Sequence, residues 1–189
     1  MRLLVLEEPR PIKLTVEAFG LLGEAGAIDR DGRVELIEGV IVATSPQRRT
    51  HSYSKNEIAY RLRRAVEALG WRWQVQTEAT LALPPHNAPV PDILLTDAPR
   101  GEGYVPAGSV SLVVEIADSS LRWDLEDKRR LYALHDIPEY WVVNVAGWQL
   151  HRFWRARGGD YAGHDVVPLT GELRRATLAG LAIVGADIV

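Results

Sequence analysis

The sequence predicts an α/β fold built on a mixed β-sheet that is flanked by helices. One long segment, Ser52–Leu69, has apolar side chains at the three- and four-residue spacing of an amphipathic helix. Another segment, Ser109–Ala117, is almost continuously apolar, which is typical of a central strand covered on both faces. A helical pattern over residues 123–135 then precedes a strand pattern over 139–145. This order predicts that the last two core strands are joined by a crossover helix.

Length and composition fit a single globular domain. The 189 residues are enough to bury a sizeable core, and we expect one domain over residues 1–189. Apolar residues make up 47% of the chain and charged residues 25%. This balance excludes an intrinsically disordered, collagen-like or coiled-coil protein.

The chain contains no cysteine and has a formal net charge of −3. The missing cysteines exclude zinc ribbons, Fe–S clusters, thiol catalysis and a disulfide framework, and they favour a reducing cytoplasm. Residues Met1–Arg10 lack a signal-peptide pattern, and no apolar run approaches the roughly 20 residues of a membrane span. We therefore expect a soluble cytoplasmic protein with no membrane partner, in which any nucleic-acid contact depends on a local basic surface.

The N-terminal part of the chain predicts a helix and a hairpin. Residues Thr15–Leu22 read as a short helix with Thr15 as its N-cap. Two β runs within Arg33–Thr44 fold back on each other at Glu38–Gly39, a turn-capable pair. The polar stretch Ser45–Thr50 that follows is expected to be a loop.

The middle of the chain predicts the long helix and two strands. The helix Ser52–Leu69 ends at Gly70. Residues Trp71–Leu83 are rich in β-forming side chains and predict one strand, which the prolines of Pro84–Pro89 end. Residues Asp92–Thr96 predict a short apolar strand.

The C-terminal part predicts a loop, a hairpin and a terminal segment. Glycine and proline mark Asp97–Gly108 as a loop. Strands Gln149–Arg155 and Tyr161–Val167 are expected to form a hairpin that turns at Gly158–Gly159. The apolar segment Leu178–Val189 is too short for a membrane element, so it suits a docked edge segment or an oligomer contact.

Three ionic residues stand where apolar side chains are expected. Asp92 opens a buried strand, and Glu115 lies inside one whose same-face neighbours are apolar. Lys128, one of only three lysines, interrupts the apolar stripe of the helix over residues 123–135. A buried charge needs a partner, since leaving it alone costs several kcal/mol. Two carboxylates and an ammonium could hold one hard divalent cation, or form an ion cluster that only fixes strand register. Lys128 could instead pair with Asp124 or extend into solvent.

These residues and their surroundings resemble the Uma2 family of the PD-(D/E)xK, restriction-endonuclease-like superfamily. The resembling segments are ELIEGVIV, PDILL, VVEIADSS and DLEDKRRLYALHDIPEYWVV, which lie within a core of about residues 33–155. The resemblance implies a restriction-endonuclease-like fold and a Mg²⁺- or Mn²⁺-dependent endonuclease acting on nucleic acid, most plausibly DNA. It implies that Asp92, Glu115 and the carbonyl of Ile116 bind the metal and that Lys128 acts on the attacking water. The superfamily lysine usually stands at the position of Ala117, and its migration to the next helix occurs in the superfamily.

Four further residues are secondary candidates. In the family a carboxylate from the early hairpin is often placed near the metal, which suggests Glu35 or Glu38, although Glu38 fits an exposed turn equally well. His51 resembles a family histidine that contacts phosphate or relays a proton, and an exposed helix-start residue is the alternative. Gln76, with its neighbour Glu78, lies on a strand expected near Asp92 and could complete the ion shell.

Basic and aromatic residues offer a possible nucleic-acid contact. Phosphates could meet the basic residues of the long helix and its entry loop, or these could simply form its solvated face: Arg48, Arg49, Lys55, Arg61, Arg63 and Arg64. The six tryptophans could stack on bases, but core or dimer packing is the commoner role: Trp71, Trp73, Trp123, Trp141, Trp148 and Trp154.

Other chemistries lack their motifs. No two of the five histidines have the spacing of zinc ligands, no glycine-rich phosphate loop occurs, and there is no serine nucleophile elbow. The alternative to a nuclease is therefore a non-catalytic, dimeric binding or regulatory protein that keeps the fold. We expect a homo-oligomer, a dimer or higher, in either case.

Overall fold

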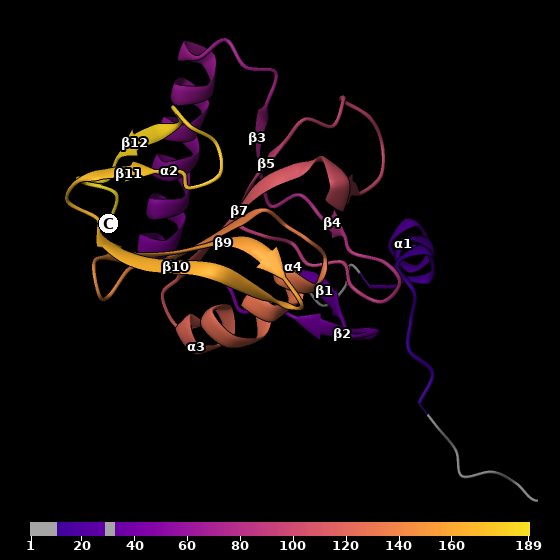
Figure 1. The fold of residues 1–189 in the computed structure, drawn as a ribbon. Coiled ribbons are helices and arrows are strands. Elements are labelled where there is room, and N and C mark those ends of the chain that lie inside the picture. The colour runs from indigo at the N-terminus through magenta and orange to yellow at the C-terminus, as the bar shows by residue number, and fades with distance from the viewer. Residues whose placement is uncertain (1–10, 29–32) are drawn as a thin grey trace, which may run out of the picture.

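A six-stranded mixed sheet forms the centre of the molecule (Figure 1). The computed structural model describes residues 11–28 and 33–189, so the expectation drawn from Met1–Arg10 lies outside the described residues. In space the strands follow the order β10-β9-β8-β7-β5-β3. Their bounds are β3 Gln74–Thr77, β5 Ile93–Thr96, β7 Val110–Ala117, β8 Glu139–Asn144, β9 Gln149–Arg157 and β10 Asp160–Pro168. The predicted α/β fold with a mixed central sheet is confirmed.

The crossover between β7 and β8 is as predicted. These two strands are parallel, whereas the other neighbours in the sheet are antiparallel. Every residue of β7 is buried, as its continuous apolar run requires. The connection is one helical segment made of α3 (Leu121–Trp123), the π-helical turn η3 (Asp124–Lys128) and α4 (Arg129–Leu134). The sequence predicted a plain α-helix here, so the π-helical turn is a local departure.

Different elements cover the two faces of the sheet (Figure 1). Helix α2 (Arg49–Ala68) and the C-terminal hairpin of β11 (Glu172–Arg174) and β12 (Ala182–Val184) pack on one face. Helix α4 packs on the other. Successive side chains of β7 alternate between these faces, so Val113, Glu115 and Ala117 point towards α4. Glu115 therefore faces the helical segment that carries Lys128.

The remaining elements form small pairings beside the main sheet. Thr15 is the N-cap of helix α1 (Val16–Glu24), as expected, because its side chain accepts a hydrogen bond from the N–H of Ala18. Strands β1 (Val34–Ile37) and β2 (Val40–Ala43) form the predicted hairpin. A separate parallel pair comprises β4 (Leu81–Ala82) and β6 (Val105–Pro106), and the turn η2 (Ala107–Ser109) follows it.

Three sequence predictions about element bounds were wrong. Residues Trp71–Leu83 do not form one strand, because Glu78 adopts a positive φ of 55° and directs the chain away from the sheet after β3. Helix α2 begins at Arg49, inside the stretch that was expected to be loop. The predicted loop Asp97–Gly108 contains the short strand β6, which pairs with β4.

A buried ion pair attaches the C-terminal hairpin to the sheet. Glu139 of β8 and Arg175, the residue after β11, lie 3.2 Å apart (Oε2 to Nε), and neither side chain is exposed. The carboxylate of Glu139 also accepts hydrogen bonds from the indole N–H of Trp141, the N–H of Ala176, and the N–H and hydroxyl of Thr177. The C-terminal segment is thus a docked edge, one of the two arrangements that its apolar sequence suggested. Among the described helices, none combines the length and the apolar character needed to cross a membrane.

Candidate active site

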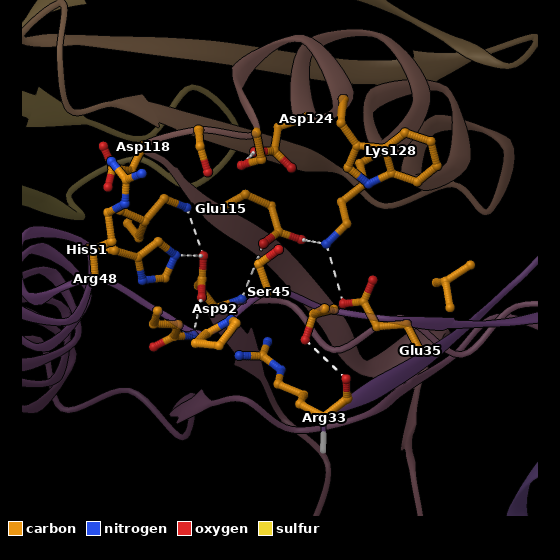
Figure 2. Close-up of a pocket in the computed structure, with 18 of the residues that line it drawn as sticks. Arg33, Glu35, Ser45, Arg48, His51, Asp92, Glu115, Asp118, Asp124 and Lys128 are labelled. Atoms are coloured by element: carbon orange, nitrogen blue, oxygen red, sulfur yellow. Dashed lines mark hydrogen bonds and ion pairs between the residues drawn. The ribbon is translucent and has the colours of Figure 1, made fainter. Parts of the chain in front are cut away.

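Asp92, Glu115 and Lys128 meet at one point of the fold (Figure 2). The ammonium of Lys128 lies 2.9 Å from Oε1 of Glu115 and 3.3 Å from Oε1 of Glu35. The N–H of Asp92 donates to Oε2 of Glu115 at 3.3 Å, and the N–H of Ile116 donates to Oδ2 of Asp92 at 2.8 Å. The three residues that the sequence singled out are therefore joined by direct hydrogen bonds or ion pairs.

Sheet pairing explains why these residues meet. Strands β5 and β7 are antiparallel neighbours with Ile93 opposite Val114, which places Asp92, the residue directly before β5, beside Glu115. The chain leaves β7 at Ala117 and returns through the helical segment on the face towards which Glu115 points. Lys128 closes the π-helical turn on this face. π-Helical turns occur frequently at functional sites.

The cluster lines a cavity of about 660 Å³. Acidic and basic groups, hydroxyl groups and one tryptophan share its wall, which is made up of Arg33, Glu35, Val42, Ala43, Thr44, Ser45, Pro46, Gln47, Arg48, His51, Asp92, Glu115, Ile116, Asp118, Ser119, Ser120, Trp123, Asp124 and Lys128. This volume falls within the range of small-molecule binding sites. The cavity can therefore admit a ligand the size of one nucleotide.

Negative charge exceeds positive charge in the buried part of this wall. Glu35, Asp92, Glu115 and Asp124 are 3–5% exposed, and the ammonium among them belongs to Lys128. Burial raises the pKa of Glu115 to about 8, with the charges of the neighbouring carboxylates adding to the effect and Lys128 opposing it. Burial likewise raises the pKa of Asp124. A site with this surplus is stabilised by taking up a proton or a cation.

Asp92 and Lys128 keep their charges. Burial opposes ionisation of Asp92, but the hydrogen bond from His51, whose Nε2 lies 3.1 Å from Oδ2, and that from Ile116 lower its pKa. Burial also disfavours the ammonium of Lys128, but the carboxyl groups of Glu115, Glu35 and Asp124, together with the hydrogen bond to Glu115, outweigh it and raise the pKa of Lys128. Lys128 is therefore a proton donor in hydrogen bonds and not a base at neutral pH.

The donor set suits a hard divalent cation. Carboxylate and main-chain oxygens are the ligands that Mg²⁺ prefers, and the surplus of buried carboxylates supplies the matching charge. In the described part of the chain no three His, Asp or Glu side chains are already grouped as a metal site. Oε1 of Glu115 accepts hydrogen bonds from Lys128 and, at 2.7 Å, from the hydroxyl of Tyr132. Cation binding would thus require small movements of these donors.

The structure separates the secondary candidates. Glu35 and His51 line the cavity, and Glu35 accepts from both Lys128 and the N–H of Val90. Glu38 is exposed at the hairpin turn, and Gln76 lies on β3 outside the cavity wall. His51 stands in the first turn of α2 and not before it, because the helix begins at Arg49.

A network of polar side chains contacts Asp92 and extends away from the cavity. The amide of Gln47 donates to Oδ1 of Asp92 at 3.4 Å and to Glu78 at 2.8 Å. Lys55 donates to both Gln47 and Glu78 at 2.6 Å, and Arg33 donates to Glu78 at 2.7 Å. The sequence left open whether Lys55 contacts phosphate or belongs to a solvated face, but its side chain is buried in this network and does not line the cavity. Lys55 therefore positions Gln47, whose amide donates to Asp92.

Of the other basic residues proposed for phosphate contact, Arg48 lines the cavity. Arg49 lies at a separate shallow depression on the outer side of α2. The guanidinium of Arg61 donates to main-chain carbonyls of the C-terminal segment and pairs with Glu57, and Arg63 donates to the carbonyl of Val75. Arg64 donates to the hydroxyl of Tyr60 on the exposed side of α2. Of these basic residues, Arg48 is thus the one that lines the cavity.

Sequence reasoning missed three site residues. Asp124 lines the cavity and accepts a hydrogen bond from Ser120, although it was considered as a partner of Lys128 alone. Tyr132 donates to Glu115, and its position on the same stripe as Lys128 was the available signal. Gln47 lies in a polar loop without periodicity, so no sequence pattern could identify its contact with Asp92.

Comparison with known proteins identifies a family and a fold. The sequence matches the family Uma2, described as "Putative restriction endonuclease", over residues 17–185. The fold is similar to the crystal structure of a "putative nuclease belonging to DUF820" from Anabaena variabilis, with a TM-score of 0.70 and 17% sequence identity over 94% of this chain and 97% of that one. At this identity the likeness shows a common fold. None of the curated proteins compared matches the chain.

Proposed function

The chain belongs to the Uma2 family, and from this premise we propose that it is a divalent-metal-dependent endonuclease that hydrolyses phosphodiester bonds of nucleic acid, with DNA as its substrate. The observation that carries the proposal is the convergence of Asp92, Glu115 and Lys128 on one cavity. A buried ion cluster that served only as structure would not need to line a cavity of this size. The family resemblance supports nucleic acid as the substrate class.

Asp92, Glu115 and the carbonyl of Ile116 are the groups that would hold the cation in this proposal. A bound Mg²⁺ supplies Lewis-acid polarisation of the scissile phosphate and lowers the pKa of water beside it. Lys128 remains protonated, so its ammonium stabilises negative charge that develops on the phosphate. Lys128 reaches the site from the helical segment that comes after β7. It can therefore fulfil this role in place of a lysine at the position of Ala117.

The proposal is tested by incubating the purified protein and its Asp92→Asn variant with single- and double-stranded DNA and RNA in Mg²⁺ or Mn²⁺. We expect cleavage by the wild type that EDTA and the substitution both abolish, because the asparagine amide cannot replace a charged ligand. Asp97→Asn is the matched control, since Asp97 pairs with Arg72 outside the cavity. Absence of any cleavage that depends on Asp92 would refute the nuclease function.

Replacing His51 by alanine is expected to weaken Mn²⁺ binding by about 10- to 100-fold, the usual effect of losing a residue that orients a metal ligand. The imidazole holds Oδ2 of Asp92 through a hydrogen bond of 3.1 Å. Calorimetric titration with Mn²⁺ measures the change, and His135→Ala serves as the control because His135 lies outside the cavity. Equal affinity in wild type and His51→Ala would show that Asp92 does not depend on this contact.

One observation favours the alternative of a non-catalytic, dimeric binding or regulatory protein. The carboxylate oxygens of Asp92 and Glu115 already accept hydrogen bonds from protein groups. In that case the cluster is structural and does not respond to metal.

The nuclease proposal also includes one domain over the whole chain, a homo-oligomeric state and a cytoplasmic location, the last because a chain without cysteine suits a reducing compartment.

A further inference from the structure

The surface of this protein is poorly suited to follow a long duplex. Its formal net charge is −3. Some of the cations around α2 are occupied within the protein, since Lys55 is buried with Glu78 and Arg61 donates to main-chain carbonyls. Arg49, Arg63 and Arg64 are exposed, which leaves few cations to follow a phosphate backbone. Binding that depends on neutralising many phosphates is therefore weak. Substrate affinity has to come mainly from contacts close to the cavity itself.

An exposed tryptophan stands at the cavity. Trp123 lines it and is 40% exposed. It directly precedes Asp124, one of the buried carboxylates, at the junction of α3 and the π-helical turn that ends in Lys128. The indole is thus positioned by the same helical segment as the proposed catalytic lysine.

A cationic side chain lines the same cavity from another element. Arg48 is the N-cap residue of α2, and its exposed side chain makes no capping hydrogen bond. Within residues 11–28 and 33–189 no carboxylate lies within ion-pair distance of its guanidinium. As far as the described residues show, the guanidinium can therefore contact a phosphate oxygen.

Building on the proposed nuclease function, we propose that Trp123 stacks on the base of an unpaired nucleotide while Arg48 contacts its phosphate, so that the substrate is single-stranded or locally unpaired nucleic acid. An aromatic face binds a base without regard to sequence. A base inside a duplex is stacked on both sides and cannot offer a face unless it leaves the helix. The cavity of about 660 Å³ has room for one nucleotide.

The base-stacking contact is tested by calorimetry with two small probes in Mn²⁺, deoxythymidine 5′-monophosphate and 2-deoxyribose 5-phosphate. The wild type is expected to bind the nucleotide about tenfold more tightly, a factor within the range found for stacking of one base. Trp123→Ala should bind the two probes equally, and Trp123→Phe should keep most of the preference. Trp148→Phe is the control, because Trp148 is 53% exposed but lies outside the cavity.

Equal binding of the two probes by the wild type, or a preference that survives in Trp123→Ala, would overturn the inference. In cleavage assays we expect a single-stranded oligonucleotide to be cut faster than the same strand in a duplex. Trp123→Ala should raise KM about tenfold for the single strand with little change in kcat, as expected for a binding contact. Faster cleavage of the duplex would also contradict the inference. Failure of the proposed function would appear differently, as no cleavage of any substrate, while the probe measurements need no cleavage at all.

Discussion

Replacing Glu115 by glutamine is expected to abolish cation binding and cleavage and, at the same time, to stabilise the metal-free protein in mildly alkaline solution. Losing a charged metal ligand removes several kcal/mol of transition-state stabilisation, so we expect cleavage to fall by about 10³-fold or more. The gain in stability follows from burial, which raises the pKa of Glu115 from 4.5 to about 8.

The sign of the stability effect follows from proton binding. Between pH 4.5 and about 8 the folded protein retains a proton on Glu115 that the unfolded chain has lost, so the free energy of unfolding falls as the pH rises through this range. Glutamine resembles the protonated acid and does not titrate. The hydroxyl of Tyr132 and the ammonium of Lys128 can still donate to its amide oxygen. At pH 8.5 we expect the variant to be more stable than the wild type by about 1–3 kcal/mol.

Urea denaturation in EDTA at pH 5.5, 7 and 8.5 measures this difference. Glu126→Gln is the matched control, since Glu126 forms an exposed pair with Arg122 on the same helical segment. Mn²⁺ at 100 times its Kd should stabilise the wild type by about 2.7 kcal/mol and leave Glu115→Gln unchanged. A variant that is less stable at every pH, together with a wild type that ignores Mn²⁺, would favour the structural ion cluster.

Replacing Glu139 by alanine is expected to lower the free energy of unfolding by about 3–5 kcal/mol, the usual effect of breaking a buried ion pair. The substitution leaves the guanidinium of Arg175 buried without its carboxylate. It also removes the acceptor for Trp141 on β8 and for Ala176 and Thr177, and the bonds of these last two link the C-terminal hairpin to the sheet. We therefore expect the hairpin to detach from the sheet more readily in this variant than in the wild type.

Thermal and urea denaturation measure the loss, with Glu172→Ala as the control. Glu172 forms an exposed pair with Arg174 on the same hairpin, so its removal should change stability by about 1 kcal/mol or less. Hydrogen exchange should show faster exchange in β11 and β12 than in β7. A loss below about 1 kcal/mol for Glu139→Ala would mean that packing alone holds the hairpin.

The sequence located the ionic trio of Asp92, Glu115 and Lys128 because each member violates a local pattern. Glu115 interrupts a continuous apolar strand, Asp92 opens another, and Lys128 interrupts an amphipathic stripe. The structure agrees in bringing the three together at one cavity, while their catalytic roles stay a prediction. The choice between Glu35 and Glu38 was not accessible in this way, because both are carboxylates of one hairpin. The hairpin turn exposes Glu38, and the strand directs Glu35 to Lys128.

Other features depend on contacts between distant parts of the chain. Lys55 lies on a helix rich in basic residues and is read as solvated, yet it is buried against Glu78 on another element. The strand expected over Trp71–Leu83 breaks at Glu78, whose carboxylate is held by Lys55 and Arg33. Likewise, nothing near Glu139 or Arg175 in the sequence indicates that they pair.

The sequence by itself determined the α/β class, the order of the core strands and helices, and the identity of the three anomalous ionic residues. These features follow from the periodicity of apolar side chains, which is encoded within ten to twenty neighbouring residues. Only the tertiary structure decided which charges are buried together, which cations remain beside the cavity and where Trp123 stands. Those outcomes depend on the burial and pairing of groups far apart in the chain. Local sequence patterns do not indicate which of these distant groups come into contact.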